Sequence, residues 1–415
     1  MQFREIKEVY ASKVFNSKGK PAISVRITTS KGTVETIAPQ GTSKGKNEVK
    51  DFSIKGIDYS IEFVNNFAKK LCEMPSSIDM FDDLEQVEKL LKHYDSSEDY
   101  KLIGGNALYA FEASLLKAAA KFQNVPLWKF ILGNRKKIMP RPLGNAIGGG
   151  MHVSQNLKTD YQEFLLLPKT ENFYNAYFIN LEAYKELKKL LIVKDKKWQG
   201  TLTDENAMAS SLDNKQVFEL LQELRDIIKE KFGTTVEIGV DMAASSLWNG
   251  IGYVYSNYPG RDVKAKEEQL NYVQDLIKRF NLVYVEDPFY EEDFNSFSRL
   301  KTRIDNMANN CLLCGDDLTC TNPERIERAV KENAINAVII KPNQIGSLMR
   351  MKKALEIAKQ NRIIPVMSHR SGESADDTIA DLCVGFQIPL IKAGILGKER
   401  FAKLNRLMKI EREKI

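Results

Sequence analysis

The chain has 415 residues, a formal net charge of +6, 43% hydrophobic residues and 28% charged residues, which excludes a disordered or collagen-like chain. Lys and Arg are interspersed with Asp and Glu, which disfavours nucleic-acid binding, and no apolar run approaches the roughly 18 residues of a membrane span. Because the charged start MQFREIKEVY does not resemble a signal peptide, we expect a cytoplasmic protein.

The first 45 residues alternate apolar and polar side chains, which predicts a meander of strands. Apolar residues at helical spacing follow over 57–72, and 105–122 is so rich in Ala and Leu that we expect a helix buried on several sides. The stretch GNRKKIMPRP, at 133–142, combines Gly, Pro and charge. We therefore expect a small α+β domain over 1–135 and a second domain over 136–415.

After Pro142, short apolar runs alternate with amphipathic helical stretches. The runs are EFLLLP (163–168), TVEIGVD (235–241), LVYVED (282–287), CLLCGDD (311–317), AVIIKPN (337–343), IIPVMSH (363–369) and PLIKAG (389–394). Apolar strands alternating with helices predict a parallel sheet covered on both faces, and six or more such units favour a barrel. The predicted fold class is α/β, with a (β/α)8-type barrel over 136–415.

Polar residues stand at the carboxyl ends of nearly all these runs. They are Asp241, Glu286, Asp287, Asp316, Asp317, Lys341, His369, Arg370 and Lys392. Because the carboxyl ends of barrel strands meet at one mouth, we expect these residues to converge on one site. Helix capping would explain one or two of them, such as Asp287 or Asp317, but not two lysines, since a buried lysine without a role is costly.

The carboxylates of Asp241, Glu286 and Asp316 suit a cation that prefers oxygen ligands, such as Mg²⁺. The sequence contains no Cys–His cluster for zinc. Cys311 and Cys314 form a C-x-x-C within an apolar run, where packing is the better interpretation. The odd total of five cysteines argues against a disulfide framework.

Many segments resemble the enolase family, the phosphopyruvate hydratases, in the same order along the chain. They are SKGKPAISV (17–25), APQGTSKG (38–45), QEFLLLP (162–168), IGVDMAAS (238–245), VEDPF (285–289), GDDLTCTNP (315–323), KPNQIGS (341–347), SHRSGES (368–374) and KERFAKLNRLMKIE (398–411). The resemblance implies an N-terminal α+β capping domain and a catalytic barrel. It also implies Mg²⁺-dependent, reversible dehydration of 2-phosphoglycerate to phosphoenolpyruvate in glycolysis, with two Mg²⁺ per site, in a homodimer or a ring of dimers.

The resemblance further implies a role for each matching residue. Lys341 would be the base and Glu205 the acid, with Glu163 beside it and His152 and His369 lining the pocket. The substrate would be held by Lys392, Arg370, Ser371, Gln162 and Ser43. The metal ligands would be Asp241, Glu286, Asp316 and Ser43.

The sequence departs from the usual enolase pattern at several positions. Gln40 and Lys44 replace a serine and a threonine, Asn206 and Ala207 replace two glycines, and Asn16, Lys18 and Lys20 stand in a segment associated with the dimer contact. The Lys44 cation would assist phosphate binding or mark a changed substrate, and the lost glycines would stiffen the loop. Two alternatives stay open: a paralogue acting on another phosphorylated hydroxy acid, and a non-catalytic binding or structural protein.

Overall fold

The computed structural model describes residues 1–42, 44–153, 159–257, 262–307 and 310–413. Its N-terminal part is a three-stranded antiparallel sheet in the order β1-β2-β3, as the alternating pattern predicts. The strands are β1 (Ile6–Phe15), β2 (Pro21–Thr29) and β3 (Gly32–Ile37). The helices that follow are α1 (Ile57–Cys72), α2 (Leu84–Leu91), α3 (Gly105–Phe122) and α4 (Leu127–Leu132).

Helix α3 is the central element of this part of the molecule. Its Ala- and Leu-rich sequence buries almost every side chain, because small residues allow neighbouring elements to approach on several faces. One turn is fixed to the sheet by a hydrogen bond from the Ser114 hydroxyl to the carbonyl of Val25, at 2.8 Å. The prediction of a helix buried on several sides is confirmed.

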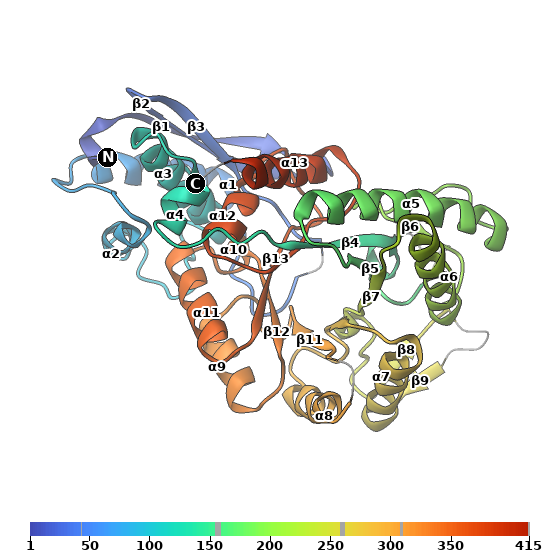
Figure 1. The fold of residues 1–415 in the computed structure, drawn as a ribbon. Coiled ribbons are helices and arrows are strands. Elements are labelled where there is room, and N and C mark those ends of the chain that lie inside the picture. Colours follow the sequence, from blue (N-terminus) through green and yellow to red (C-terminus); the bar gives the residue numbers. More distant parts are fainter. Residues whose placement is uncertain (43, 154–158, 258–261, 308–309, 414–415) are drawn as a thin grey trace.

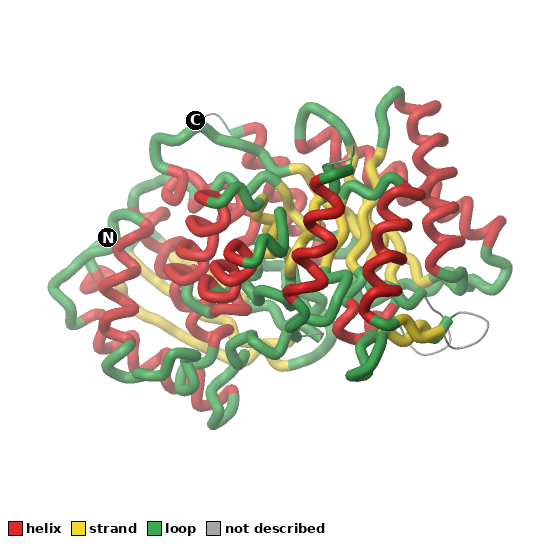
Figure 2. Tube along the Cα trace, turned by 90° about the horizontal axis from the view of Figure 1, so that it is seen from below, coloured by secondary structure: helices red, strands yellow, loops and turns green. Residues whose placement is uncertain are grey.

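The rest of the chain forms a closed eight-stranded barrel, because β14 pairs with β4. Figure 2 shows these strands surrounded by helices, with the N-terminal sheet lying at one end of the molecule. The barrel strands are β4 (Arg141–Gly148), β5 (Glu163–Pro168), β7 (Val236–Asp241), β10 (Tyr284–Glu286), β11 (Leu312–Gly315), β12 (Ala337–Ile340), β13 (Ile364–Ser368) and β14 (Leu390–Lys392).

The barrel differs from the predicted parallel sheet in its first two strands. Strand β4 was not among the predicted runs, since Pro142, Gly144 and Gly148 interrupt its apolar sequence. Strand β5 runs antiparallel to both β4 and β7. In its described part, the connection from β4 to β5 contains only a 3₁₀ turn, Gly150–His152, and no crossover helix, which a parallel pair would need. The short strand β6 (Met208–Ala209) extends the sheet beside β4.

Helices cover the outside of the barrel, and the termini of the described chain both lie near the N-terminal sheet (Figure 1). These helices are α5 (Phe173–Lys194), α6 (Asn214–Phe232), α7 (Lys266–Phe280), α8 (Phe294–Asp305), α9 (Pro323–Lys331), α10 (Pro342–Ile345), α11 (Leu348–Gln360), α12 (Thr378–Gly385) and α13 (Lys398–Arg412). A small hairpin, β8 (Tyr253–Tyr255) and β9 (Asp262–Lys264), lies outside the barrel. Among the described helices, none combines the length and apolarity needed to cross a bilayer.

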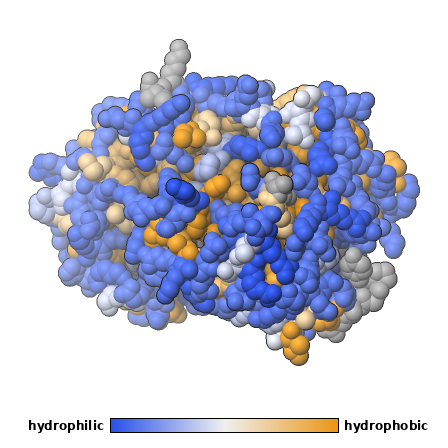
Figure 3. All heavy atoms as spheres, turned by 60° about the horizontal axis from the view of Figure 1, so that its bottom comes forward, coloured by the Kyte–Doolittle hydropathy of each residue, from blue (hydrophilic) through white to orange (hydrophobic). Residues whose placement is uncertain are grey.

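Two apolar cores stabilise this arrangement. The smaller one draws side chains from seven barrel strands and includes Cys314, whereas Cys311 belongs to the larger core between the barrel and the helices. Both cysteines are buried and free, which confirms the packing interpretation of the C-x-x-C. The face drawn in Figure 3 is mostly hydrophilic and carries only a few apolar areas.

Candidate active site

The barrel register brings polar side chains of neighbouring strands to the same level. Glu163, the first residue of β5, lies opposite Asp241, the last residue of β7, which in turn lies opposite Glu286, the last residue of β10. Because β5 runs antiparallel, its first residue reaches the mouth at which the parallel strands end. Lys392 ends β14 at this same mouth, beside Ser368 of β13.

The Lys392 ammonium lies at the centre of three carboxylates. Its Nζ is 2.8 Å from Asp241 Oδ2, 3.0 Å from Glu286 Oε1 and 3.2 Å from Glu163 Oε2. Burial lowers the pKa of Lys392, but Asp241, Glu163 and Glu286 raise it more, so its pKa stays well above the usual value. The raised pKa favours the charged form of Lys392 at the mouth of the barrel.

The second lysine, Lys341, contacts the Asp316 carboxylate directly. Asp316 also accepts a hydrogen bond of 3.0 Å from the Gln344 side chain. Burial, Arg370 and Lys392 each lower the pKa of Lys341, as expected for a group surrounded by cations. The contact with Asp316 outweighs these three effects and raises the pKa of Lys341. The charged ammonium is therefore the favoured form while Asp316 is paired with it.

Asp287 organises the loop that carries Asp316. Its carboxylate accepts hydrogen bonds from the backbone N–H groups of Asp316, at 3.1 Å, and Asp317, at 2.6 Å. Burial, with Asp317 and Asp316 nearby, raises the pKa of Asp287 well above its usual range. Asp287 therefore has a structural task, close to the capping interpretation considered from the sequence, and both Asp287 and Asp317 line the pocket.

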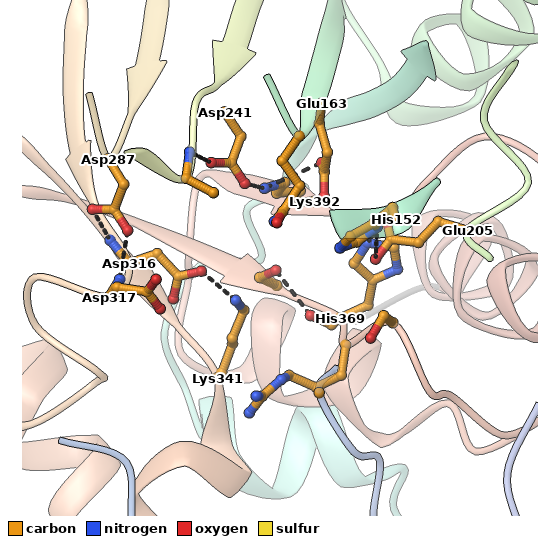
Figure 4. A pocket seen from close by; sticks show the side chains of 16 residues that line it. His152, Glu163, Glu205, Asp241, Asp287, Asp316, Asp317, Lys341, His369 and Lys392 are labelled. Carbon is orange, nitrogen blue, oxygen red and sulfur yellow. Dashed lines mark hydrogen bonds and ion pairs between the residues drawn. The ribbon is translucent and has the colours of Figure 1, made fainter. Parts of the chain in front are cut away.

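The opposite wall contains a cluster that we call the histidine side, made of His152, Asp204, Glu205 and His369. His152 Nδ1 lies 3.1 Å from Asp204 Oδ1, and His369 Nε2 lies 3.4 Å from Glu205 Oε2. Figure 4 shows the two rings converging on Glu205, across the pocket from Asp316 and Lys341. We call Glu163, Asp241, Glu286, Asp316, Lys341 and Lys392 the lysine–carboxylate side.

The two buried glutamates of the pocket differ in their affinity for protons. Burial raises the pKa of Glu163 to about 8, although Lys392 opposes the shift. Burial also raises the pKa of Glu205, but His369 and His152 lower it more, so it is well below the usual value. The pKa of His152 is raised to about 9, since Asp204 and Glu205 outweigh burial, while burial lowers that of His369. These shifts favour the protonated form of Glu163 and the ionised form of Glu205.

Arg370 and Ser371 lie on the loop that follows β13. The Arg370 guanidinium is bound to both carboxylate oxygens of Glu48, at 3.1 and 3.0 Å, and to the side-chain oxygen of Asn343 at 3.2 Å. The Ser371 hydroxyl contacts both the backbone N–H and the hydroxyl of Thr42, at 2.9 Å each. Both residues line the pocket, where Arg370 contributes an almost fully buried cation.

The structure brings most of the residues predicted from the sequence together around one pocket. Its lining includes Gln162, Glu163, His152, Glu205, Asp241, Asp316, Lys341, His369, Arg370, Ser371 and Lys392. Glu286 is fully buried and is reached from the pocket through Lys392. The predicted ligand Ser43 lies outside the described residues.

The residues at which the sequence departs from the usual pattern are well anchored. Gln40 and Lys44 both contact Asp51, at 2.7 and 2.5 Å, and neither lines the pocket. Asn206 adopts a positive φ of 62°, which asparagine tolerates better than most residues, and Ala207 is fully buried. The loop around Glu205 therefore keeps its turn without the two glycines.

The donor atoms of the lysine–carboxylate side fit a hard divalent cation. Asp241, Glu286 and Asp316 supply buried carboxylate oxygens, and Glu163 adds a fourth buried carboxyl group, whose Oε2 lies 3.2 Å from the Lys392 ammonium. Asp287, Asp316 and Asp317 also place one oxygen each within 4.8 Å of one another. The three predicted ligands contact two different lysines: Lys392 binds Asp241 and Glu286, and Lys341 binds Asp316.

Some polar residues at the mouth were not assigned from the sequence. Arg400, in the first turn of α13, is almost fully buried, donates to the Ser371 carbonyl at 3.1 Å and lowers the pKa of Glu205. Asn145 donates to Glu205 at 3.2 Å. The only sequence signal for Asp204 was its position beside Glu205. Glu48 gave no signal, since its partner Arg370 is 322 positions away.

Comparisons with known proteins agree with this geometry. The family described as "Enolase, C-terminal TIM barrel domain" matches residues 136–414, and "Enolase, N-terminal domain" matches residues 6–131. Proteins named enolase from Methanosphaera stadtmanae and Archaeoglobus fulgidus are each 37% identical, over 98% of this chain and 97% of their own length. The enolase from Thermoplasma acidophilum is 36% identical over 98% of both chains. The chain therefore belongs to the enolase family, the hydro-lyases known as phosphopyruvate hydratases.

Proposed function

We propose that this protein catalyses the reversible, Mg²⁺-dependent dehydration of 2-phosphoglycerate to phosphoenolpyruvate and water in glycolysis and gluconeogenesis. The observation that carries the proposal is the opposition of Lys341 to Glu205 across a pocket whose walls also hold Lys392 and Arg370. Dehydration needs a base on one face of the substrate and an acid near the leaving hydroxyl, and the two walls supply one of each.

In this proposal, Lys341 removes the proton on the carbon next to the substrate carboxylate. That proton is weakly acidic, because its removal puts a second negative charge on the carboxylate oxygens. The fixed cation Lys392 stabilises this charge. Lys341 accepts the proton as a neutral amine, so its contact with Asp316 must be released or neutralised first.

The proposed ligands of Mg²⁺ are Asp241, Glu286 and Asp316, with Ser43 as a further ligand of a second ion. Bound there, the ions would neutralise these carboxylates, including the one that raises the pKa of Lys341, and would stabilise the developing negative charge. The three buried carboxylates support a cation at this position, and the enolase family supports metal dependence.

On the histidine side, we propose that Glu205 donates the proton that leaves with the hydroxyl group. Because the lowered pKa of Glu205 favours its ionised form, Glu205 must take up a proton before it can donate one. Two groups near Glu205 hold a proton more strongly than usual: His152, whose ring nitrogen lies 3.8 Å from Glu205, and Glu163, which interacts with Glu205 electrostatically. His152 and His369 flank Glu205 and fix its orientation.

We propose that Arg370 and Ser371 bind the phosphate group, with Gln162 contributing to the substrate side of the pocket. A guanidinium beside a hydroxyl offers several N–H and O–H donors to phosphate oxygens.

We further propose the division of the chain into a capping domain over 1–135 and a catalytic barrel over 136–415, supported by the gap between α4 and β4. A homodimer, or a ring of dimers, in the cytoplasm is the assembly we propose.

The test is conversion of 2-phosphoglycerate to phosphoenolpyruvate, followed by absorbance of the product, with Mg²⁺ and then with excess chelator. We expect turnover that chelator abolishes and that added Mg²⁺ restores. Folded, metal-loaded protein without turnover would contradict the proposal. The next experiment would then be a screen of other phosphorylated hydroxy acids, because the paralogue alternative differs only in the substrate.

A further inference from the structure

The turn between β1 and β2 is held rigidly beside the active site. The Asn16 side-chain oxygen accepts hydrogen bonds from the backbone N–H groups of Lys18, at 2.9 Å, and Lys20, at 3.1 Å. Gly19 completes the turn with a φ of +66°. The backbone N–H of Ser17 donates to the carbonyl of Glu373 at 2.8 Å, which joins the turn to the loop carrying Arg370 and Ser371.

From this fixed turn, the side chain of Lys18 extends to two other loops. Its ammonium contacts the carboxylate of Asp204 and the hydroxyl of Thr42. The ammonium is shielded from solvent, since only 15% of the Lys18 side chain is exposed. Thr42 in turn contacts Ser371, so one cation joins the N-terminal loop to the loop that carries Glu205.

Asp204 transmits this contact to the histidine side. One of its oxygens is occupied by Lys18, and the other lies 3.1 Å from His152 Nδ1. The same ring nitrogen lies 3.8 Å from Glu205. The charged groups that act on His152 are Asp204, Glu205 and Glu163. With one oxygen fixed by Lys18, the Asp204 carboxylate cannot rotate away from the ring without breaking an ion pair.

We propose that Lys18 is a positioning residue of the active site, which holds Asp204 against His152 and thereby fixes the surroundings of Glu205. This proposal rests on the function proposed above. An ammonium is a compact point charge that can contact one carboxylate oxygen and one hydroxyl at the same time. Although Lys18 belongs to the N-terminal part of the chain, its task lies at the barrel mouth, 186 positions away.

The first test reads out His152 without any turnover. The chain has three histidines, His93, His152 and His369, so ring NMR signals can be assigned by single substitutions. In Lys18→Met, we expect Asp204 to be released and the pKa of His152 to fall by at least half a unit from about 9. Lys18→Arg keeps the charge and should keep the pKa. His93 serves as the internal reference.

The second test measures 2-phosphoglycerate dehydration by the metal-loaded enzyme across pH. We expect Lys18→Met to lower kcat about tenfold, to change KM less than threefold and to shift the pH profile, with Lys18→Arg restoring all three. The matched control is Lys20→Met, an exposed lysine in the same turn. A loss of stability alone would lower the melting temperature without shifting the pH profile. Thermal unfolding therefore distinguishes a loss of stability from a positioning effect.

The outcomes separate this inference from the proposed function. If the native enzyme turns over 2-phosphoglycerate and Lys18→Met behaves like Lys20→Met in both tests, the role of Lys18 is refuted and the function stands. A rise in the His152 pKa would also refute the positioning role. It would show that the positive charge of Lys18 acts on the ring only by electrostatic repulsion, without holding Asp204 in place. If the native protein has no such activity, the His152 titration still decides whether Lys18 positions the ring.

Discussion

The lysine–carboxylate side and the histidine side of the pocket differ in where their residues come from. The first is built from strand ends and the short loops directly after them, whose positions are set by the barrel register. The second is built from longer loops that lie over the mouth: His152 follows β4, and Asp204 and Glu205 precede β6. Only His369 is placed by the end of a barrel strand, β13.

The two sides also differ in how the pKa values of their groups are shifted. On the lysine–carboxylate side, Lys392 is enclosed by three carboxylates and stays charged. On the histidine side, His152 and His369 have pKa values shifted in opposite directions, although both rings contact Glu205. Strand ends thus supply the charge of Lys392 together with one group of raised pKa, Glu163, while the loops supply groups whose proton affinity depends on where their neighbours lie.

The largest effect that we expect comes from Lys341→Ala. Removing the proposed base should lower kcat at least about 10³-fold, within the range ascribed to general acid–base catalysis. The fold should persist, because Lys341 adds no packing to the two cores. Circular dichroism checks the fold, and metal titration should show binding at least as tight as before, since Asp316 loses a competing cation. Retention of more than a tenth of the activity would show that another group is the base.

Glu286→Gln tests the lysine–carboxylate side as a metal site. We expect the Mg²⁺ concentration for half-maximal activity to rise about tenfold or more, because one charged ligand becomes neutral. Tyr284→Phe is the companion variant: it removes the 2.6 Å hydrogen bond to Glu286 and keeps the charge, so its effect should be smaller. Calorimetric titration measures both. An unchanged metal dependence in Glu286→Gln would exclude Glu286 as a ligand.

The raised pKa of Glu163 predicts a pH dependence of stability in metal-free protein. The folded state holds a proton that the unfolded chain releases above about 4.5, so stability should fall as pH rises from about 4.5 to about 8. His152 gives a similar loss between about 6.5 and 9. Urea unfolding with chelator should therefore show a smaller loss in Glu163→Gln than in the native protein, by about 1 kcal/mol or more.

The control for this experiment is Glu237→Gln, on the neighbouring strand β7 at its other end, where Glu237 pairs with Arg141 at 3.0 Å. Its pH dependence should match that of the native protein. If Glu163→Gln behaves in the same way as this control, Glu163 is ionised in the folded state. The contrast between Glu163 and Glu205 would then disappear.

The smallest effect that we expect comes from Lys44→Thr, which restores the residue usual in enolases. Lys44 is partly exposed and pairs with Asp51, which also accepts a hydrogen bond from Gln40. Because Lys44 does not line the pocket, kcat/KM should change less than about threefold. A loss of tenfold or more would mean that Lys44 reaches the substrate, and the loop would then have to be counted with the site.

Strand ends could be predicted from the sequence because a barrel places the carboxyl ends of successive apolar runs at one mouth. Asp241, Glu286, Lys341 and Lys392 were found in this way. Strand β4 escaped the pattern because its glycines and proline lower its apolar character, and the antiparallel direction of β5 follows from a connection that contains no helix in its described part.

Contacts between loops could not be predicted from local patterns. Lys18 and Asp204 are 186 positions apart, and Glu48 and Arg370 are 322 apart, so no spacing rule joins them. The sequence raised Lys44 as a second phosphate cation, but its partner in the structure is Asp51. A charged residue in a loop has many possible partners, and only the folded chain selects one.

The ion pair between Arg370 and Glu48 gives this buried cation of the pocket a counter-ion from the chain itself. The guanidinium is engaged by both oxygens of a carboxylate from the N-terminal part of the chain. A small monoanion such as chloride that displaced Glu48 from Arg370 would replace one negative charge by another, so its binding would be only weakly favourable. A phosphate group carries more negative charge and three acceptor oxygens, so it competes with Glu48 for Arg370 more effectively than chloride does. In the proposed function, any anion that binds Arg370 must therefore compete with Glu48 for the guanidinium.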